Sequence, residues 1–447
     1  MAYNFRIYGV FAILLQDTKQ RKDTTWLEKG KEAVKVSSII QIMLFPILIH
    51  SFHQISFAFV FSTIVTTPIL TILLFFGMFT FFFWKIQLPI AIFLTKPIHF
   101  CCAVLEKIAE GIAHIPGITA FCITPKPYWI FLYYLFLFGY ILLKKQKRKR
   151  VKEVQKRIGK KILLCILALN LVLEVGTIVT RKFTIHFLDV GQGDACLIQT
   201  RAGKTLLIDG GGNAKEEYDP GKQVLLPFLA EHQIGRLDCL FVSHADLDHI
   251  GGTIAVLEKI PVKKIILGKQ FEENANLEKL LQLAKRRKIT VEIVEEGMEI
   301  KVEKDVSLSV IWPSRENRIT ENGVNNNSLV FRLSYANFSM LFTGDIEKIA
   351  EEKILEQVDK NRLKADVLKV GHHGSKTSSI SEWVEAVKPK IALIGVGENN
   401  RFGHPNGEVV ERLEKSGAKV YRTDEDGEIC LQIGRKGKIR VKKWLEK

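Results

Sequence analysis

Two histidines and two aspartates lie within six residues of one another in the second half of the chain. They are His244, Asp246, Asp248 and His249, and they follow the apolar run 240–242, which predicts a short buried strand. Imidazole and carboxylate groups are metal ligands, and a rigid strand would fix the backbone that presents them to two adjacent ions. The alternative is an exposed polar loop in which an aspartate caps a helix.

Polar side chains also end or follow other predicted strands of the second half. These strands are apolar runs at 184–190, 205–208, 340–343, 365–370 and 391–396. The polar residues at or beyond their ends are Asp189, Asp209, Asp345, His372, His373, Ser375 and His404. Because strand ends of an α/β fold converge on one edge of the sheet, we expect these groups to share a site. Five of the eleven histidines lie at such turns, which favours a shared site over separate structural roles.

The first half of the chain carries long apolar segments at 36–50, 55–84, 129–143 and 162–180. A membrane-spanning helix needs about twenty apolar residues, so the segment 55–84 either tilts or breaks at Pro68. Residues 86–115 mix prolines and charges and predict an amphipathic or re-entrant piece, so the number of crossings between residues 55 and 127 stays open. Buried helices of a large soluble core are the alternative, which the insertion scale disfavours.

The net charge of +16 is concentrated in one place. Residues 144–161 contain eleven Lys or Arg and one acid, Glu153. The positive-inside rule puts this segment in the cytoplasm, and segment 162–180 would then deliver everything after Arg181 to the outer face of the membrane. Contact with DNA phosphates is the alternative, although a charge excess confined to one segment is weak evidence for it. The chain has seven cysteines, an odd number, and no Cys-x-x-Cys motif, so no disulfide framework is predicted.

These patterns predict five regions. They are an amino-terminal, partly cytoplasmic segment (1–35), a channel-like membrane region (36–143), a basic cytoplasmic loop (144–161), a last transmembrane helix (162–180) and a soluble domain (181–447).

The order of the polar motifs resembles a known family pattern. Asp209, the run 244–249, Asp345 and the pair 372–373 resemble the metallo-β-lactamase fold, an αββα sandwich with a two-metal site at its edge. More narrowly, the chain resembles the ComEC-type competence proteins, which are membrane channels for DNA uptake with an appended nuclease domain of that fold. The stretches that carry this resemblance are 189–194, 327–330, 372–375 and 423–424 in the soluble part and 52–56 in the membrane part.

The chain departs from the family pattern in two respects. Full-length relatives have an amino-terminal membrane segment, an OB-like domain and more spans, so we expect a short form, a fragment or a split gene. Hydrolytic members of the wider fold carry a second histidine where Asp246 stands and another one between His249 and Asp345, whereas residues 250–344 contain none. Asn327 and its neighbours occupy that region. A site richer in oxygen favours Mn²⁺, with Zn²⁺ or Mg²⁺ as the alternatives.

The resemblance implies a metal-dependent phosphodiesterase that degrades one DNA strand during import. Two divalent ions are expected, one held by His244 and Asp246, the other by Asp248, His249 and either His372 or His373, with Asp345 as the bridge. Asp248 would help to generate the nucleophile, His404 and Ser375 would contact the phosphate or the leaving group, and Asp189, Asp209 and Asn327 would orient ligands.

Single-stranded DNA, the membrane and other competence proteins are the expected partners, together with a second copy or a separately encoded amino-terminal part. Two other hypotheses compete with a DNA-degrading uptake protein. The first is a transport or structural membrane protein whose metallo-β-lactamase-like domain is inactive. The second is a membrane-tethered phosphoesterase for another substrate.

Overall fold

The computed structural model describes residues 26–145, 161, 164, 168–170, 172–212, 218–269, 274–316 and 318–445. The chain forms two compact units, Met1–Ile162 and Leu163–Lys447. Most of the basic segment 144–161 and most of the amino-terminal segment 1–35 lie outside the described residues. Their expected positions relative to a membrane therefore stay predictions.

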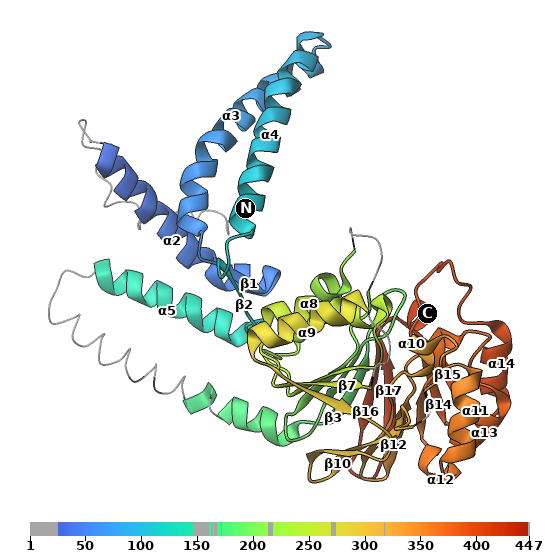
Figure 1. Ribbon diagram of the computed structural model, residues 1–447. Helices are drawn as coiled ribbons and strands as arrows, with labels where there is room; N and C mark the ends of the chain where they lie inside the picture. The colour runs from blue at the N-terminus through green and yellow to red at the C-terminus, as the bar shows by residue number, and fades with distance from the viewer. Residues whose placement is uncertain are drawn as a thin grey trace. The chain divides into compact units, whose positions relative to one another are not determined.

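The first unit is helical. Its helices are α2 (Trp26–Phe52), α3 (Phe59–Lys85), α4 (Ile90–Ala113) and α5 (Pro127–Lys145), and its two short strands are β1 (Gln54–Ser56) and β2 (Thr119–Phe121). The strands pair antiparallel, and α3 and α4 pack side by side as a long hairpin (Figure 1). The helix α2 begins ten residues before the predicted segment 36–50, and Ile55 lies in β1 instead of in the following helix.

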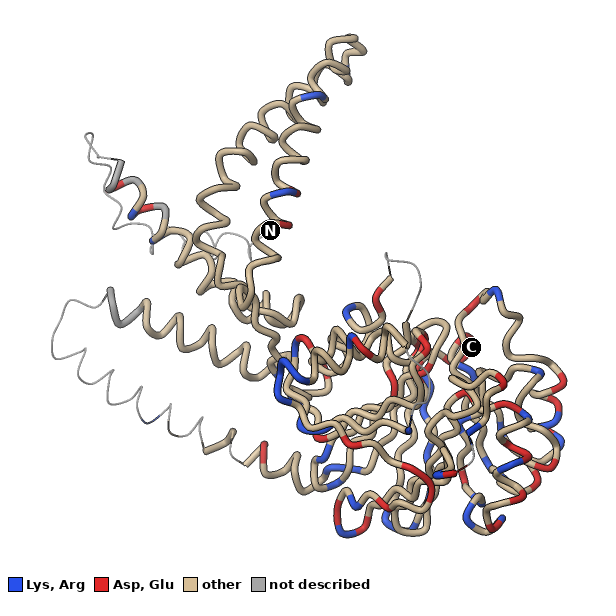
Figure 2. The backbone as a smooth tube through the Cα atoms, in the orientation of Figure 1, with Lys and Arg blue, Asp and Glu red and all other residues tan. Residues whose placement is uncertain are grey.

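Among the described residues, two helices, Gly30–Phe52 and Phe59–Lys85, are long and apolar enough to cross a membrane. The helix α3 runs unbroken through Pro68 over 27 residues, a length of about 40 Å against a hydrocarbon core of about 30 Å. A tilt would accommodate the excess length in a bilayer. The hairpin of α3 and α4 carries few charged residues, most of them on α4 (Figure 2), and α3 has no fully buried residue.

The second unit contains two sheets. The strands of the first are β3 (Phe183–Phe187), β4 (Cys196–Gln199), β5 (Thr205–Ile208), β6 (Cys239–Val242), β7 (Lys264–Gly268), β8 (Thr290–Val294), β16 (Ile429–Ile433) and β17 (Ile439–Lys443), in the order β17-β16-β3-β4-β5-β6-β7-β8. The strands of the second are β9 (Glu299–Glu303), β10 (Val306–Trp312), β11 (Val330–Tyr335), β12 (Phe338–Phe342), β13 (Val367–Lys369), β14 (Ile391–Ile394) and β15 (Lys419–Arg422), in the order β15-β14-β13-β12-β11-β10-β9.

Helices cover the outer faces of both sheets (Figure 1). Those beside the first sheet are η1 (Gly221–Leu225), α7 (Leu226–Glu231), α8 (Leu247–Lys259) and α9 (Ala275–Arg287). Those beside the second include α11 (Lys348–Gln357), α12 (Lys360–Leu363), α13 (Ser381–Val387) and α14 (Gly407–Lys415). One core fills the space between the sheets, and another lies between the second sheet and its helices. The predicted αββα sandwich is confirmed.

The strand directions determine where the polar turns lie. Strands β5 to β8 are parallel to one another, as are β12 to β15. Parallel strands have both faces covered and are therefore mostly apolar, as are β12 and β5, which are buried along their whole length. Their carboxyl ends therefore point to the same edge of each sheet, which brings the polar residues that follow β5, β6, β12, β13 and β14 together.

Candidate metal centre

Backbone hydrogen bonds join the turn after β5 to the first turns of α8. The Gly210 N–H donates to the His249 carbonyl oxygen at 2.7 Å, and the Gly252 N–H donates to the Gly211 carbonyl oxygen at 2.8 Å. A Cβ atom at Gly252 would collide with the Gly210 carbonyl oxygen, so only glycine permits this approach. The contact fixes the helix that carries His249 against the turn that carries its hydrogen-bond partners.

Four buried side chains offer ligand atoms that all lie within 4.8 Å of one another: Asp194, His249, Asp345 and His373. The His249 Nε2 atom is 3.2 Å from Asp345 Oδ1, and the His373 Nε2 atom is 3.2 Å from Asp345 Oδ2. The His373 Nε2 atom is also 3.3 Å from Asp248 Oδ2. One carboxylate therefore bridges two imidazoles, with a second carboxylate beside them.

Asp209, buried at the end of β5, orients the ligands of the next loop. Its carboxylate accepts hydrogen bonds from the Ser243 N–H and hydroxyl, both at 2.7 Å, and lies 2.9 Å from the His249 Nδ1 atom. The Nδ1 proton of His249 therefore points at Asp209 and its Nε2 atom points at Asp345.

His244 and Asp246 lie beside this cluster. The His244 Nδ1 atom is 3.0 Å from the Ser243 hydroxyl, and its buried Nε2 atom has no hydrogen-bond partner among the described residues. That nitrogen is 3.8 Å from Asp246 Oδ2. Asp246 precedes α8 in extended conformation but its side chain makes no capping hydrogen bond, so the helix-cap alternative does not account for it.

The two neighbouring histidines after β13 point in different directions. His372 and His373 have φ angles of 46° and 51°, a left-handed turn that non-glycine residues rarely adopt. His373 is directed into the cluster and its Nδ1 atom lies 2.8 Å from the Gly395 carbonyl oxygen. The His372 Nδ1 atom instead lies 3.1 Å from Glu347 Oε1. The structure thus brings His373, and not His372, together with the other candidate ligands.

A buried lysine completes the cluster. Lys369, the last residue of β13, forms ion pairs with Asp194 and Asp345, the latter at 3.1 Å, and donates to the Gly344 carbonyl oxygen at 2.7 Å. The side chain is 3% exposed, so the ammonium group is removed from water. The two carboxylates stabilise its positive charge in place of water. Its position offsets part of the negative charge that the aspartates gather.

The charged side chains of the cluster shift one another's pKa values. Burial disfavours charged His249 and His373, yet nearby carboxylates outweigh it and raise the pKa of His373 to about 10 and that of His249 well above its ordinary value. Burial would raise the pKa of Asp345, but His249, His373 and Lys369 hold it well below its ordinary range. Burial, reinforced by His249, lowers the pKa of His244 to about 3. His244 is therefore neutral. The Ser243 hydroxyl donates its own proton to Asp209 and so accepts one from His244 Nδ1, which leaves the lone pair on Nε2.

Two of the remaining predicted site residues form hydrogen bonds within their own loops. The Asp189 carboxylate accepts a hydrogen bond from the Gly191 N–H at 3.0 Å within its own turn. Asn327 donates to the carbonyl oxygens of Ile319 and Gly323 at 2.8 and 2.6 Å and holds that loop together.

Two others lie in the turns next to the cluster. The Ser375 hydroxyl is 3.0 Å from the Thr377 hydroxyl. The ring centroid of His404 is 6.3 Å from that of His373, and its buried Nδ1 atom has no hydrogen-bond partner among the described residues.

Three residues of the site were missed by the reasoning from sequence: Asp194, Lys369 and Glu347. The turn 189–194 contains both Asp189 and Asp194, and sequence alone does not show which of them faces the cluster. Lys369 was a charged residue within the apolar run 365–370, and that anomaly was its only signal. Glu347 lies two residues after Asp345 and contacts His372 only in the folded chain.

The donor set fits divalent metal ions. Neutral imidazole nitrogens and carboxylate oxygens are their ligands. The unpartnered His244 Nε2 atom and the Asp345 carboxylate provide both, and a bound ion would displace the protons that the carboxylates favour on His249 and His373. The buried Asp/His cluster could thus bind metal. This candidate metal centre also contains a buried cation, Lys369, beside its carboxylates.

Two family comparisons divide the chain as the motifs do. Residues 188–398 match the family described as "Metallo-beta-lactamase superfamily", and residues 7–148 match the family described as "Competence protein". The chain therefore joins a competence-protein segment to a metallo-β-lactamase domain. This combination is that of the ComEC-type competence proteins, which the motifs predicted, and the relatives described next carry competence names.

Similar proteins are known from several bacteria. The chain is 29% identical over 407 residues to "ComE operon protein 3" of Bacillus subtilis, covering 88% of this chain and 51% of that protein. It is 34% identical over 266 residues to "Competence protein ComA" of Neisseria gonorrhoeae, covering 58% of this chain and 34% of that protein. This chain thus spans about half of the first relative and about a third of the second. Among solved structures, a mutant of CmlA β-hydroxylase covers 57% of this chain and 54% of its own, at 13% identity and a TM-score of 0.37.

Proposed function

We propose that this protein is a multi-pass membrane protein of DNA uptake whose second unit hydrolyses phosphodiesters outside the cytoplasm, degrading one strand as the other enters. The observation that supports hydrolysis is the convergence of Asp345, His249 and His373 beside the unpartnered His244 nitrogen. Membership of a superfamily of generally metal-dependent hydrolases supports the same chemistry. The two long apolar helices support the membrane location.

Two divalent ions would bind in this arrangement. His244, Asp246 and Asp345 would hold one, and Asp248, His249, His373 and Asp345 would hold the other. Bound ions of this kind lower the pKa of a water molecule and neutralise charge on a phosphate. Because the donors are rich in oxygen, Mn²⁺ is the favoured metal.

The chain's own residues supply position and charge. Asp209 keeps the His249 Nε2 atom directed at the cluster, where an ion would take the place of its proton, and the buried Asp345 carboxylate spans the two imidazoles. Burial and the nearby imidazoles of His373 and His372 lower the pKa of His404 to about 4. His404 is then neutral at physiological pH, and in the tautomer with its proton on Nδ1 it can donate a hydrogen bond to a phosphate oxygen or to the leaving group.

The decisive experiment is cleavage of labelled single-stranded DNA by the full chain in detergent, with Mn²⁺, Mg²⁺ and Zn²⁺ tested separately. Asp248→Asn keeps the shape of the side chain and removes the charge that faces a cation. We expect it to lower the rate at least a hundredfold, the loss typical of removing one preorganised group. Equal cleavage by both proteins would show that the activity arises elsewhere.

The orientation in the membrane is tested separately. A reporter enzyme that works only outside the cytoplasm, fused after Arg181, should be active in cells, because the basic segment 144–161 is expected to stay inside. An inactive reporter would place the second unit in the cytoplasm and remove strand degradation during import from the proposal.

A second candidate function is transport by a protein whose metallo-β-lactamase domain is not catalytic. The observation that favours it is Lys369, because its ammonium group pairs with Asp194 and Asp345 where a cation would otherwise bind. Absence of cleavage with every metal, together with no measurable metal binding, would support this candidate over hydrolysis.

A further inference from the structure

The loop after β14 presents an exposed aromatic ring beside the metal centre. Phe402 is 54% exposed, and the only other exposed aromatic side chain among the described residues from 183 to 445 is Trp444. Single exposed apolar residues are common and need no explanation by themselves. The surroundings of Phe402 are what set it apart.

A series of rings connects Phe402 to the cluster. Its ring lies near-parallel to that of His404, with centroids 5.8 Å apart and planes at 25°. The His404 ring is in turn near-parallel to that of His373, at 6.3 Å and 27°. Bases along one strand are separated by about 3.4 Å, so the two steps together span only a few nucleotides.

The loop conformation is fixed without help from the Phe402 ring. The Asn400 side chain donates to the carbonyl oxygens of Gly397 and His404 at 3.1 and 2.7 Å. Its own oxygen accepts hydrogen bonds from the N–H groups of Phe402 and His404 at 3.2 and 3.1 Å. Four hydrogen bonds from one side chain hold the turn, so the phenylalanine is presented in a preorganised position and binding need not order the loop.

A cation lies against the same ring. The guanidinium carbon of Arg401 is 5.0 Å from the Phe402 ring centroid, within the range of a cation–π contact. No carboxylate among the described residues forms an ion pair with Arg401. An exposed, planar cation next to an exposed ring is the combination that binds single-stranded nucleic acid, because the ring stacks on a base while the cation meets the phosphate.

We propose that Arg401 and Phe402 form a stacking platform that binds one unpaired base of the substrate strand and its flanking phosphate. In a duplex both faces of a base are covered by its neighbours, so such a platform selects single-stranded nucleic acid or a frayed end. This inference rests on the proposed function for its substrate class. It adds the residues that would exclude intact duplex from the metal centre.

The test measures binding apart from cleavage. The full chain in detergent is titrated with a single-stranded oligonucleotide that contains 2-aminopurine and has a hydrolysis-resistant phosphorothioate backbone. Stacking on a protein ring changes the fluorescence of this base. We expect Phe402→Leu to weaken binding about 5- to 150-fold, the range for loss of one base–aromatic stack, and to remove the fluorescence change.

Three further variants separate stacking from other causes. Phe402→Trp keeps a stacking ring and should retain tight binding. Arg401→Ala should weaken binding and reduce the slope of log affinity against log salt by about 0.7, the loss of one phosphate contact on a single strand. Trp444→Leu removes the other exposed aromatic side chain and should bind as the wild type does.

The platform would be overturned if the wild type and Phe402→Leu bound the single strand with equal affinity. It would also be overturned if Phe402→Leu lost as much affinity for a blunt duplex as for the single strand. Both results are independent of catalysis. Failure of the wild type to cleave DNA with any metal would refute the proposed hydrolysis instead, while weaker single-strand binding by Phe402→Leu would still support the platform.

Discussion

Replacing Asp209 by asparagine should weaken metal binding without unfolding the domain. In the wild type the carboxylate accepts three hydrogen bonds, from the Ser243 N–H and hydroxyl and from His249 Nδ1. An amide has one accepting oxygen and one donating nitrogen. If the oxygen faces the Ser243 N–H, the NH₂ group faces the His249 ring and requires its Nδ1 atom to be an acceptor. The Nε2 atom of His249 then carries the proton and cannot bind a metal.

The opposite orientation of the amide places its NH₂ group against the Ser243 N–H, donor against donor. Either way one hydrogen bond to a charged group is lost, which destabilises the fold by about 1.5–3 kcal/mol. Loss of a partner that orients a ligand lowers metal affinity about 10- to 100-fold, or about 1.4–2.8 kcal/mol. We expect Asp209→Asn to show both effects.

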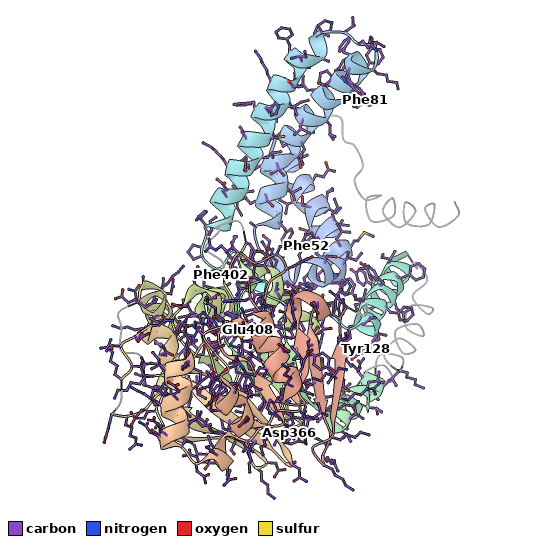
Figure 3. All side chains as sticks on the ribbon, turned by 90° about the vertical axis from the view of Figure 1, so that its right-hand side faces the viewer. Phe52, Phe81, Tyr128, Asp366, Phe402 and Glu408 are labelled. Atoms are coloured by element: carbon purple, nitrogen blue, oxygen red, sulfur yellow. The ribbon has the colours of Figure 1, made fainter. Side chains whose placement is uncertain are left out.

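Asp366→Asn is the matched control. The Asp366 carboxylate likewise accepts a hydrogen bond from a backbone N–H, that of Ser339, at 3.0 Å, but it touches no candidate ligand. Asp366 and Phe402 lie toward opposite ends of the second unit in Figure 3. The control should lose a similar amount of stability while its metal affinity is unchanged.

The assay is competition for Mn²⁺ between the full chain and a coloured chelator, with thermal melting followed by circular dichroism on the same samples. If Asp209→Asn binds Mn²⁺ within about twofold of the wild type, the reasoning from the His249 tautomer is wrong. A loss of affinity shared by Asp366→Asn would mean that general destabilisation, and not the tautomer, lowers the metal affinity.

The other expected outcomes concern metal preference, the buried lysine and pH. Activity should be higher with Mn²⁺ than with Zn²⁺, and Asp246→His should shift that preference toward Zn²⁺ because imidazole suits the softer ion; full activity with tightly bound stoichiometric Zn²⁺ would contradict this. Lys369→Met should destabilise the metal-free protein by about 3–5 kcal/mol, because it leaves two buried carboxylates without their cation; an unchanged melting temperature would refute it. Burial alone would lower the pKa of His186, but hydrogen bonds to Cys430 and to Glu428, at 2.7 Å, raise it to about 9. The resulting stability, about 3 kcal/mol at most, is present below about pH 6.5 and lost as pH rises through 9, so wild type should lose more stability between pH 6 and pH 10 than Glu428→Gln.

The sequence by itself determined the fold class and the chemical character of the site. Polar residues at the ends of apolar runs predict strand ends in an α/β domain, because strand ends and hydrophobic alternation are local properties of the chain, and the family resemblance then implied the αββα sandwich. The order of Asp209, the run 244–249, Asp345 and the pair 372–373 carried the family resemblance, which the comparisons confirm. The long apolar segments likewise predicted the helices α2 and α3, with errors only at their ends.

Only the tertiary structure decided which side chains meet. The choice between His372 and His373 depends on a left-handed turn, and spacing alone cannot distinguish two adjacent residues. Lys369 and Asp194 are 175 residues apart in the sequence. They form an ion pair because the two sheets pack with their carboxyl-terminal edges together. Contacts between strand ends of different sheets depend on how the sandwich closes. That closure is set by the whole core between the sheets and not by any local pattern.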